Sequence, residues 1–188
     1  MNTPNKLTFA RILLAFICIG LILRRDFTSL LLAFSIFIVA SITDFFDGFL
    51  ARRNNLTSDL GRLLDPIADK ILIIGVFCAF LELGIINTWV VSLIMFREFI
   101  ITSLRLYGLN KGIVLEAKKF GKHKTFSQIL GICIVFLTLI LAHKFPGNKA
   151  VGFLQDKFIP LFMWYIVIIT LFSGVYYFWV NRRAIRTF

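Results

Sequence analysis

The chain is short of charged residues, and this shortage excludes an ordinary water-soluble protein. Charged residues make up 16% of its 188 residues, whereas soluble domains carry about 25%. Hydrophobic residues make up 59%, and the mean hydropathy is +0.86. We therefore expect a single all-α, membrane-embedded domain that spans residues 1–188.

Cysteines and acidic residues are also few. Cys18, Cys78 and Cys133 lie in separate apolar stretches without the spacing of a metal or redox site, and we interpret them as small hydrophobic residues. Ten acidic residues stand against 21 lysines and arginines, which gives a formal net charge of +11. On so apolar a chain, this excess indicates the positive-inside rule of membrane proteins rather than a nucleic-acid partner.

Six apolar stretches predict six transmembrane helices. The first ends at about residue 23, the second begins at about residue 28, and the others are expected at about residues 60–83, 89–109, 126–142 and 158–180. No signal-peptide cleavage site follows the first stretch, so we expect it to be retained. Residues 143–157 are expected to form an outside loop.

Six spans put both termini on one side of the membrane, and most of the basic residues are then on that side. The other side holds only five of the 21, namely Arg24, Arg25, Lys144, Lys149 and Lys157. This bias places the termini in the cytoplasm. The location that we expect is the bacterial inner membrane.

Four aspartates interrupt the apolar pattern at regular spacing. The motif reads Asp44-x2-Asp47-Gly48-x2-Ala51-Arg52-x8-Gly61-x3-Asp65-x3-Asp69. On a helix, Asp44 and Asp47 share one face with Ala51. Asp65 and Asp69 share a face of the next helix, across a short polar loop. Four gathered carboxylates repel one another unless Mg²⁺, Mn²⁺ or Ca²⁺ neutralises them. Ion pairing with nearby arginines is the structural alternative, but four acids on two matched faces exceed what pairing requires.

This motif resembles the signature of the CDP-alcohol phosphotransferases, integral membrane enzymes of phospholipid synthesis, and it fills every fixed position of that signature. The resemblance implies a CDP-alcohol phosphotransferase-like bundle with a site for two divalent cations, Mg²⁺ or Mn²⁺, that grip a diphosphate. Its implied metal ligands are Asp44, Asp47, Asp65 and Asp69. Asp69 is also implied as the general base that takes a proton from the acceptor alcohol.

The resemblance further implies a binding site for CDP-diacylglycerol. The residues implied in it are Gly48, Ala51, Arg52, Gly61, Thr8 and Arg11, the last two from a Pro-Asn-x-Leu-Thr-x-x-Arg opening similar to a family segment near the nucleotide. Small residues would admit the nucleotide against the helices, although close helix packing is an alternative for them. Membrane anchoring, helix capping and snorkelling are the alternatives for the polar members of the set.

The acceptor alcohol is predicted from two arginines. Arg97 and Arg105 lie within about 80° of each other on a helix, and arginines near a membrane cavity suit an anionic acceptor. The segments Arg97-Glu98-Phe99-x2-Thr102-x2-Arg105 and Gly121-Lys122-x-Lys124-Thr125 resemble the phosphatidylglycerophosphate synthase branch of the family. That resemblance implies a site for sn-glycerol 3-phosphate made of Arg97, Thr102, Arg105 and Lys122. Glu98 is expected to pair with a neighbouring arginine, and residues beyond about Gln128 match only as generic apolar helices.

The expected reaction transfers the phosphatidyl group from CDP-diacylglycerol to sn-glycerol 3-phosphate and releases CMP. The same chemistry with serine, inositol phosphate or phosphatidylglycerol stays open, although serine would leave Arg97 and Arg105 without a phosphate partner. A basic loop on anionic lipid explains Lys118 and Lys119 but not arginines inside a helix. A divalent-cation transporter is an alternative from another functional class. It would need acids near mid-membrane, whereas the four aspartates are expected to cluster at one membrane side. Homodimers are usual in the family that the motif resembles, so a homodimer is expected here.

Overall fold

The computed structural model describes the backbone of residues 3–54, 59–111 and 120–185. Within these ranges, side chains are described except at 3–8, 44–54, 59–69, 109–110, 120–122, 183 and 185. The described part is helical, with short turns and no strand. Its elements are α1 Thr3–Leu23, α2 Phe27–Asn54, α3 Asp59–Glu82, α4 Thr88–Asn110, α5 Phe120–Lys144, α6 Lys149–Phe153, the π-helical η1 Leu154–Phe158, and α7 Ile159–Ile185. The all-α prediction is confirmed.

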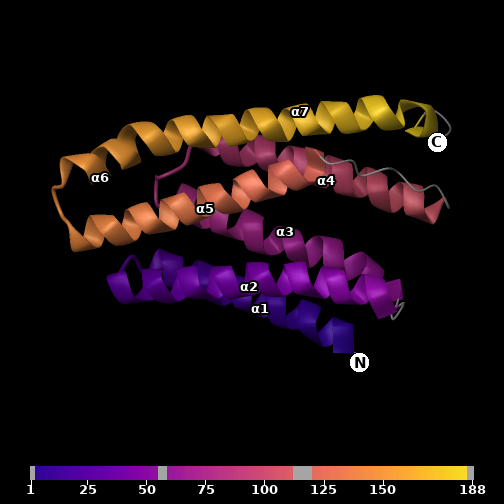
Figure 1. Cartoon of the computed structure of the whole chain (residues 1–188), viewed down its shortest axis with the longest axis horizontal. Coiled ribbons are helices and arrows are strands. Elements are labelled where there is room, and N and C mark those ends of the chain that lie inside the picture. The colour runs from indigo at the N-terminus through magenta and orange to yellow at the C-terminus, as the bar shows by residue number, and fades with distance from the viewer. Residues whose placement is uncertain (1–2, 55–58, 112–119, 186–188) are drawn as a thin grey trace.

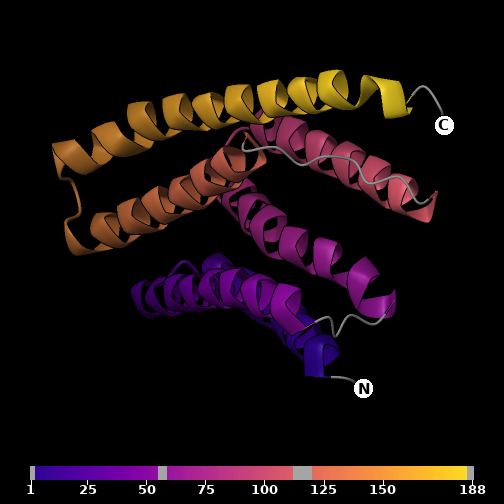
Figure 2. The same cartoon turned by 45° about the vertical axis from the view of Figure 1, so that its right-hand side comes forward.

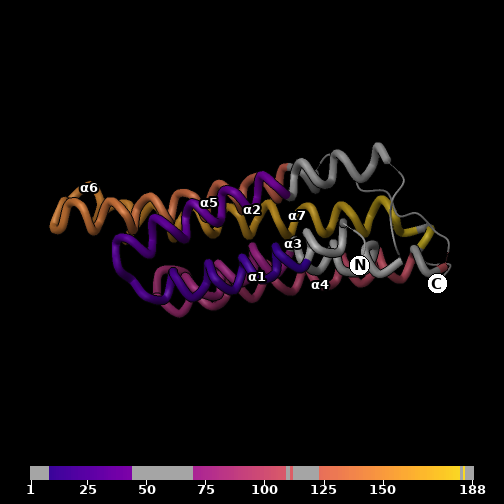
Figure 3. The backbone as a smooth tube through the Cα atoms, turned by 90° about the horizontal axis from the view of Figure 1, so that it is seen from below, coloured from indigo at the N-terminus to yellow at the C-terminus, as the bar shows by residue number. Residues whose placement is uncertain are grey.

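The six long helices pack in a closed ring. Helix α1 packs against α2 and α3, α3 against α4, α4 against α7, α7 against α5, and α5 against α2. All six run roughly along the long axis of the molecule (Figure 1, Figure 3), and α3 lies between the α1–α2 pair and α4 (Figure 2). Helix α1 begins and α7 ends at the same end of the bundle (Figure 1).

Aromatic rings fill the centre of the ring of helices. The Phe136 ring of α5 lies 5.3 Å from Phe34 and 6.0 Å from Phe37, both of α2, and 5.2 Å from Phe80 of α3. Phe37, Phe80 and Phe136 are fully buried. Tilted and edge-on aromatic pairs of this kind stabilise a fold by about 0.5–1.5 kcal/mol each beyond their buried area. Phe136 therefore joins α5 to α2 and α3, both of which are distant from it in the sequence.

The turn between α1 and α2 is fixed by backbone conformation and a cap. Arg25 has a φ of 61°, which ends α1. The side chain of Asp26 then accepts a hydrogen bond from the Ser29 amide at 2.9 Å, and its carbonyl accepts one from Leu30 at 3.0 Å. Asp26 is thus the N-cap of α2. The Ser29 amide holds the pKa of the Asp26 carboxyl below its usual value.

Two helices begin earlier than their apolar stretches. Helix α5 starts at Phe120, within the basic segment. The prediction of a loop over 143–157 is wrong beyond Asn148, whose side chain accepts a hydrogen bond from the Ala150 amide at 2.9 Å and starts a helix there. That helix continues through η1 into α7, so residues Lys149–Arg182 form one stretch of 34 residues. Hydropathy marks the part of a helix that favours hydrocarbon, whereas capping marks where the helix starts.

Two helical stretches of the described residues are long and apolar enough to cross a membrane, His123–Lys144 and Lys149–Arg182. Phe9–Leu23 and Phe27–Thr43 are shorter apolar helices. The prediction of six transmembrane helices therefore stays a prediction.

Replacing the phenylalanine at the centre of the bundle, Phe136, tests this description of the core. We expect Phe136→Ala to lower the free energy of unfolding by about 3–5 kcal/mol, because it removes the contacts of α5 with α2 and α3 and leaves a cavity. Unfolding of the detergent-solubilised protein, followed by circular dichroism, measures the loss. Phe126→Ala is the matched control, because Phe126 lies on the same helix and is 67% exposed. Equal losses in the two variants would contradict this description of the core.

Candidate functional site

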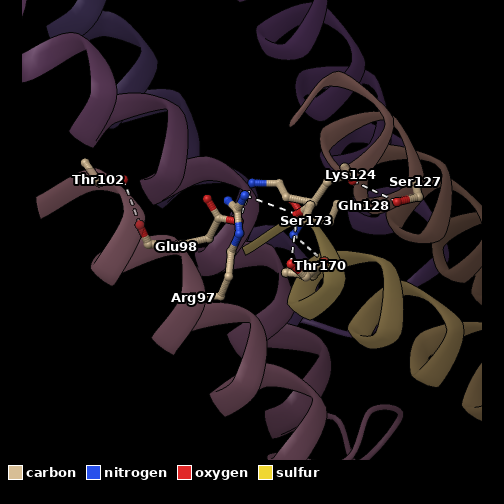
Figure 4. A network of polar contacts seen from close by, with 8 residues as sticks. All are labelled: Arg97, Glu98, Thr102, Lys124, Ser127, Gln128, Thr170 and Ser173. Carbon is tan, nitrogen blue, oxygen red and sulfur yellow. Dashed lines mark hydrogen bonds and ion pairs between the residues drawn. The ribbon is translucent and has the colours of Figure 1, made fainter. Parts of the chain in front are cut away.

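Three charged side chains are buried together where α4 and α5 meet α7. Arg97 and Glu98 come from α4 and Lys124 from α5, with side-chain exposures of 10%, 7% and 8%. Arg97 Nη1 lies 3.3 Å from Glu98 Oε1. The Lys124 ammonium donates to the same carboxylate oxygen. We call Arg97, Glu98 and Lys124 the buried ion cluster (Figure 4).

Helix α7 holds Arg97 from the other side. Arg97 Nη2 donates a hydrogen bond to Ser173 Oγ at 3.1 Å, and that hydroxyl donates in turn to the Thr170 carbonyl at 2.8 Å. The stem of Arg97 crosses Gly174, where an added Cβ would lie 3.1 Å from Arg97 Cγ. A glycine at this position therefore leaves room for the arginine to lie flat against the helix.

Further polar contacts join α5 to α7 beside the buried ion cluster. Gln128, which is 1% exposed, donates from Nε2 to Thr170 Oγ1 at 3.5 Å. Ser127 Oγ donates to the Lys124 carbonyl at 2.8 Å. These groups are nearly all removed from solvent and are paired with one another, as buried polar groups in native proteins are. The contacts fix the position of Lys124 relative to α7 (Figure 4).

The other predicted acceptor residues follow along α4. Thr102 donates from its hydroxyl to the Glu98 carbonyl at 2.7 Å. Arg105 is exposed, and its guanidinium carbon lies 6.0 Å from the centre of the Tyr177 ring of α7, at the outer limit of a cation–π contact. The two predicted arginines thus both lie against α7. Lys122 is in α5, and its side chain is outside the described residues.

The backbone of the acidic motif is helical in both of its described parts. Asp44 and Asp47 lie in α2, and Asp65 and Asp69 lie in α3, so the face-sharing spacing inferred from the sequence applies. The side chains of several predicted site residues lie outside the described residues, namely Asp44, Asp47, Gly48, Ala51, Arg52, Gly61, Asp65, Asp69 and Thr8. Among the side chains that are described, no three His, Cys, Asp or Glu gather into a metal site.

Two described residues link the acidic motif to its surroundings. Lys70 directly follows Asp69 in α3 and lies within electrostatic range of both Glu98 and Lys124. The helix that carries the second half of the acidic motif therefore brings Lys70 within electrostatic range of the buried ion cluster. Arg11 of α1 is 7% exposed. It lies in the helix that packs against both α2 and α3, and its role in nucleotide binding stays a prediction.

Sequence reasoning found part of this site. The expected pairing of Glu98 with an arginine is confirmed, but Lys124 as its second partner was missed. The contribution of α7 was missed too, because that helix matched only as a generic apolar segment. One signal was available in the spacing of Thr170, Ser173, Gly174 and Tyr177 at i, i+3, i+4 and i+7, which puts them on one helix face. We call these four residues the α7 polar stripe.

Comparison with known proteins identifies close relatives of the whole chain. A family model described as CDP-alcohol phosphatidyltransferase matches residues 1–176. The chain is similar to the CDP-diacylglycerol–glycerol-3-phosphate 3-phosphatidyltransferase of Bacillus subtilis, with 35% identity over 99% of this chain and 98% of that protein. A protein of the same name from Rickettsia typhi is 32% identical over 100% of this chain and 98% of its own length. The resemblance inferred from the motif is confirmed, and it extends beyond Gln128.

The coupling inside the buried ion cluster is testable. We expect Glu98→Gln to lower the free energy of unfolding by about 3–5 kcal/mol, because it leaves buried cations without their carboxylate. Lys124→Gln should lower the free energy of unfolding less in the Glu98→Gln variant than in the wild type. The coupling free energy from the double-mutant cycle should be about 0.5–3 kcal/mol. Glu82→Gln, at an exposed position at the end of α3, is the control. Additive losses would show that Glu98 and Lys124 do not depend on each other.

Proposed function

Because the chain belongs to the CDP-alcohol phosphatidyltransferase family, we propose that it transfers the phosphatidyl group from CDP-diacylglycerol to sn-glycerol 3-phosphate. The products are phosphatidylglycerophosphate and CMP. Relatives named for these two substrates cover nearly the full length of this chain. The structural observation that carries the choice of acceptor is the buried ion cluster, which holds cations beside the acidic motif.

The charges around the buried ion cluster suit a phosphate. Arg97, Lys124 and Arg105 supply three positive charges against the single carboxylate of Glu98, an excess of two. A phosphate monoester carries a charge of about −1.5 to −2 near neutral pH. Lys122 adds a further cation in the same helix as Lys124. Glu98 fixes the orientation of Arg97 and Lys124, so the cations are held in place before the acceptor arrives.

The donor site lies in the first half of the chain. Asp44, Asp47, Asp65 and Asp69 form an all-oxygen donor set on two helical faces, and such a set fits Mg²⁺ or Mn²⁺. When bound, two such ions neutralise charge on the diphosphate and on the departing CMP. Asp69 takes the proton of the acceptor hydroxyl. That oxygen attacks the phosphorus next to diacylglycerol, and the bond from this phosphorus to the CMP oxygen breaks.

The nucleotide of the donor is held by residues on three helices. Gly48, Ala51 and Gly61 leave space against α2 and α3, since they have small side chains or none. Arg52 binds the phosphates of CDP-diacylglycerol. Thr8 and Arg11 are further proposed binding residues, and they belong to α1, which packs against both of these helices.

We propose that the chain crosses the bacterial inner membrane as six transmembrane helices, with this site at the cytoplasmic face. The described surface supports the proposal, because Leu161, Ile168, Phe172 and Val175 are between 61% and 73% exposed on α7. Large exposed apolar areas of this kind mark a surface that lipid or another protein covers. In a six-span topology only five of the 21 lysines and arginines fall on the side opposite to the termini, and this bias supports the proposed orientation. We also propose that the protein is a homodimer, as is usual in the family.

The reaction is tested by CMP release from purified protein with CDP-diacylglycerol, Mg²⁺ or Mn²⁺, and one acceptor at a time. We expect release with sn-glycerol 3-phosphate and about a 10²–10⁴-fold loss in Asp69→Asn, because the general base is removed. Asp156→Asn is the control. Asp156 is exposed in η1, which joins α6 to α7 at the end of the bundle opposite to both termini (Figure 1). CMP release with serine or inositol phosphate alone would support the transfer reaction but contradict sn-glycerol 3-phosphate as its acceptor.

The acceptor site is tested at Arg105. We expect Arg105→Ala to raise the KM for sn-glycerol 3-phosphate about 10- to 100-fold and to leave the KM for CDP-diacylglycerol unchanged, because a charged hydrogen bond to phosphate is lost. Lys111→Ala removes an exposed cation directly after the end of α4 and controls for general loss of charge. An equal rise of both KM values in Arg105→Ala argues against a specific acceptor contact.

A further inference from the structure

Two buried polar atoms beside the buried ion cluster have no hydrogen-bond partner among the described residues. They are Nε of Arg97 and the hydroxyl of Tyr177. The other two nitrogens of the Arg97 guanidinium are engaged, since Nη1 contacts Glu98 and Nη2 donates to Ser173. Tyr177 is 6% exposed. Unpaired buried donors are rare in native proteins and cost free energy.

Tyr177 lies between the two predicted phosphate-binding arginines. It is one helical turn beyond Ser173, which holds Arg97. The guanidinium of Arg105 lies over its ring. Arg97 is within electrostatic range of both Arg105 and Tyr177. The two unpaired donors thus lie in the same contact between α4 and α7.

We propose that the Tyr177 hydroxyl and Arg97 Nε are hydrogen-bond donors to the phosphate of the acceptor alcohol, which makes Tyr177 a specificity-determining residue. This inference rests on the proposed function. Phosphate accepts several hydrogen bonds at once, so it satisfies donors that no described protein group satisfies. Arg105 is exposed and its guanidinium lies over the Tyr177 ring, so a phosphate that pairs with Arg105 is brought towards Tyr177. Acceptors without a phosphate leave both donors unpaired, and a site of this kind rejects them strongly.

A purely structural role for Tyr177 predicts different behaviour. In that case the aromatic ring would act alone, as a packing surface for Arg105 and α4. Phenylalanine would then be an adequate replacement in every respect. In our proposal the hydroxyl matters only when an acceptor is bound, because it has no described partner in the free protein.

The test compares Tyr177→Phe with wild type in thermal unfolding and in steady-state kinetics. Without ligand, we expect Tyr177→Phe to unfold at the same temperature as wild type or higher, because it removes an unpaired buried group. Affinity for inorganic phosphate and for sn-glycerol 3-phosphate, measured from the rise in unfolding temperature with ligand, should fall about tenfold, which corresponds to about 1.4 kcal/mol. The KM for sn-glycerol 3-phosphate should rise similarly, while kcat and the KM for CDP-diacylglycerol stay the same.

Tyr165→Phe is the matched control, because Tyr165 is 52% exposed on the same helix. Unchanged phosphate affinity in Tyr177→Phe would overturn the proposal, and so would a lower unfolding temperature of its ligand-free form. The binding measurement is independent of turnover. If wild type binds phosphate through Tyr177 but releases no CMP with sn-glycerol 3-phosphate, the proposed reaction fails and the assignment of Tyr177 stands.

Discussion

The burial of Glu98 is the constraint on which the second half of the structure depends. A lone carboxylate inside an apolar bundle is costly, so it needs partners with matching geometry. Arg97 supplies one from the neighbouring position of α4, and Lys124 supplies the other from α5. Arg97 in turn requires Ser173 and the space over Gly174 on α7. One buried charge thereby fixes how three helices pack together.

The fold could be predicted as far as hydropathy determines it. Apolar stretches identified the long helices because burial or lipid contact requires them to be apolar along most of their length. The starts of α5 and of the helix at Lys149 were missed, because both lie in polar sequence, and at Lys149 the cap from Asn148 sets the boundary. The order of the helices around the ring could not be predicted from the sequence either. It depends on contacts such as those of Phe136, which join helices that no local pattern relates.

Parts of the site that depend on residues close in sequence could be predicted, whereas parts that depend on contacts between distant helices could not. The acidic motif could be recognised because its spacing is set by helices within one short segment, and that spacing agrees with helical α2 and α3. The contact between Arg97 and Ser173 joins residues 76 positions apart. Nothing in the spacing around Arg97 specifies which distant helix will meet it. Only the polar residues of the α7 polar stripe, unusual in so apolar a helix, hinted at a partner.

The ring topology separates the two substrates of the proposed reaction. Helices α1, α2 and α3 carry the residues proposed for CDP-diacylglycerol and the metal ions, whereas α4, α5 and α7 carry those proposed for the acceptor. The two groups meet where α3 packs against α4, and Lys70, next to Asp69, lies within electrostatic range of Glu98 there. The proposed general base is therefore at the boundary between the groups, where a proton must be taken from the acceptor as it attacks the donor. Changes on α4, α5 and α7 could then alter the acceptor without altering the donor site, because all four proposed metal ligands lie on α2 and α3.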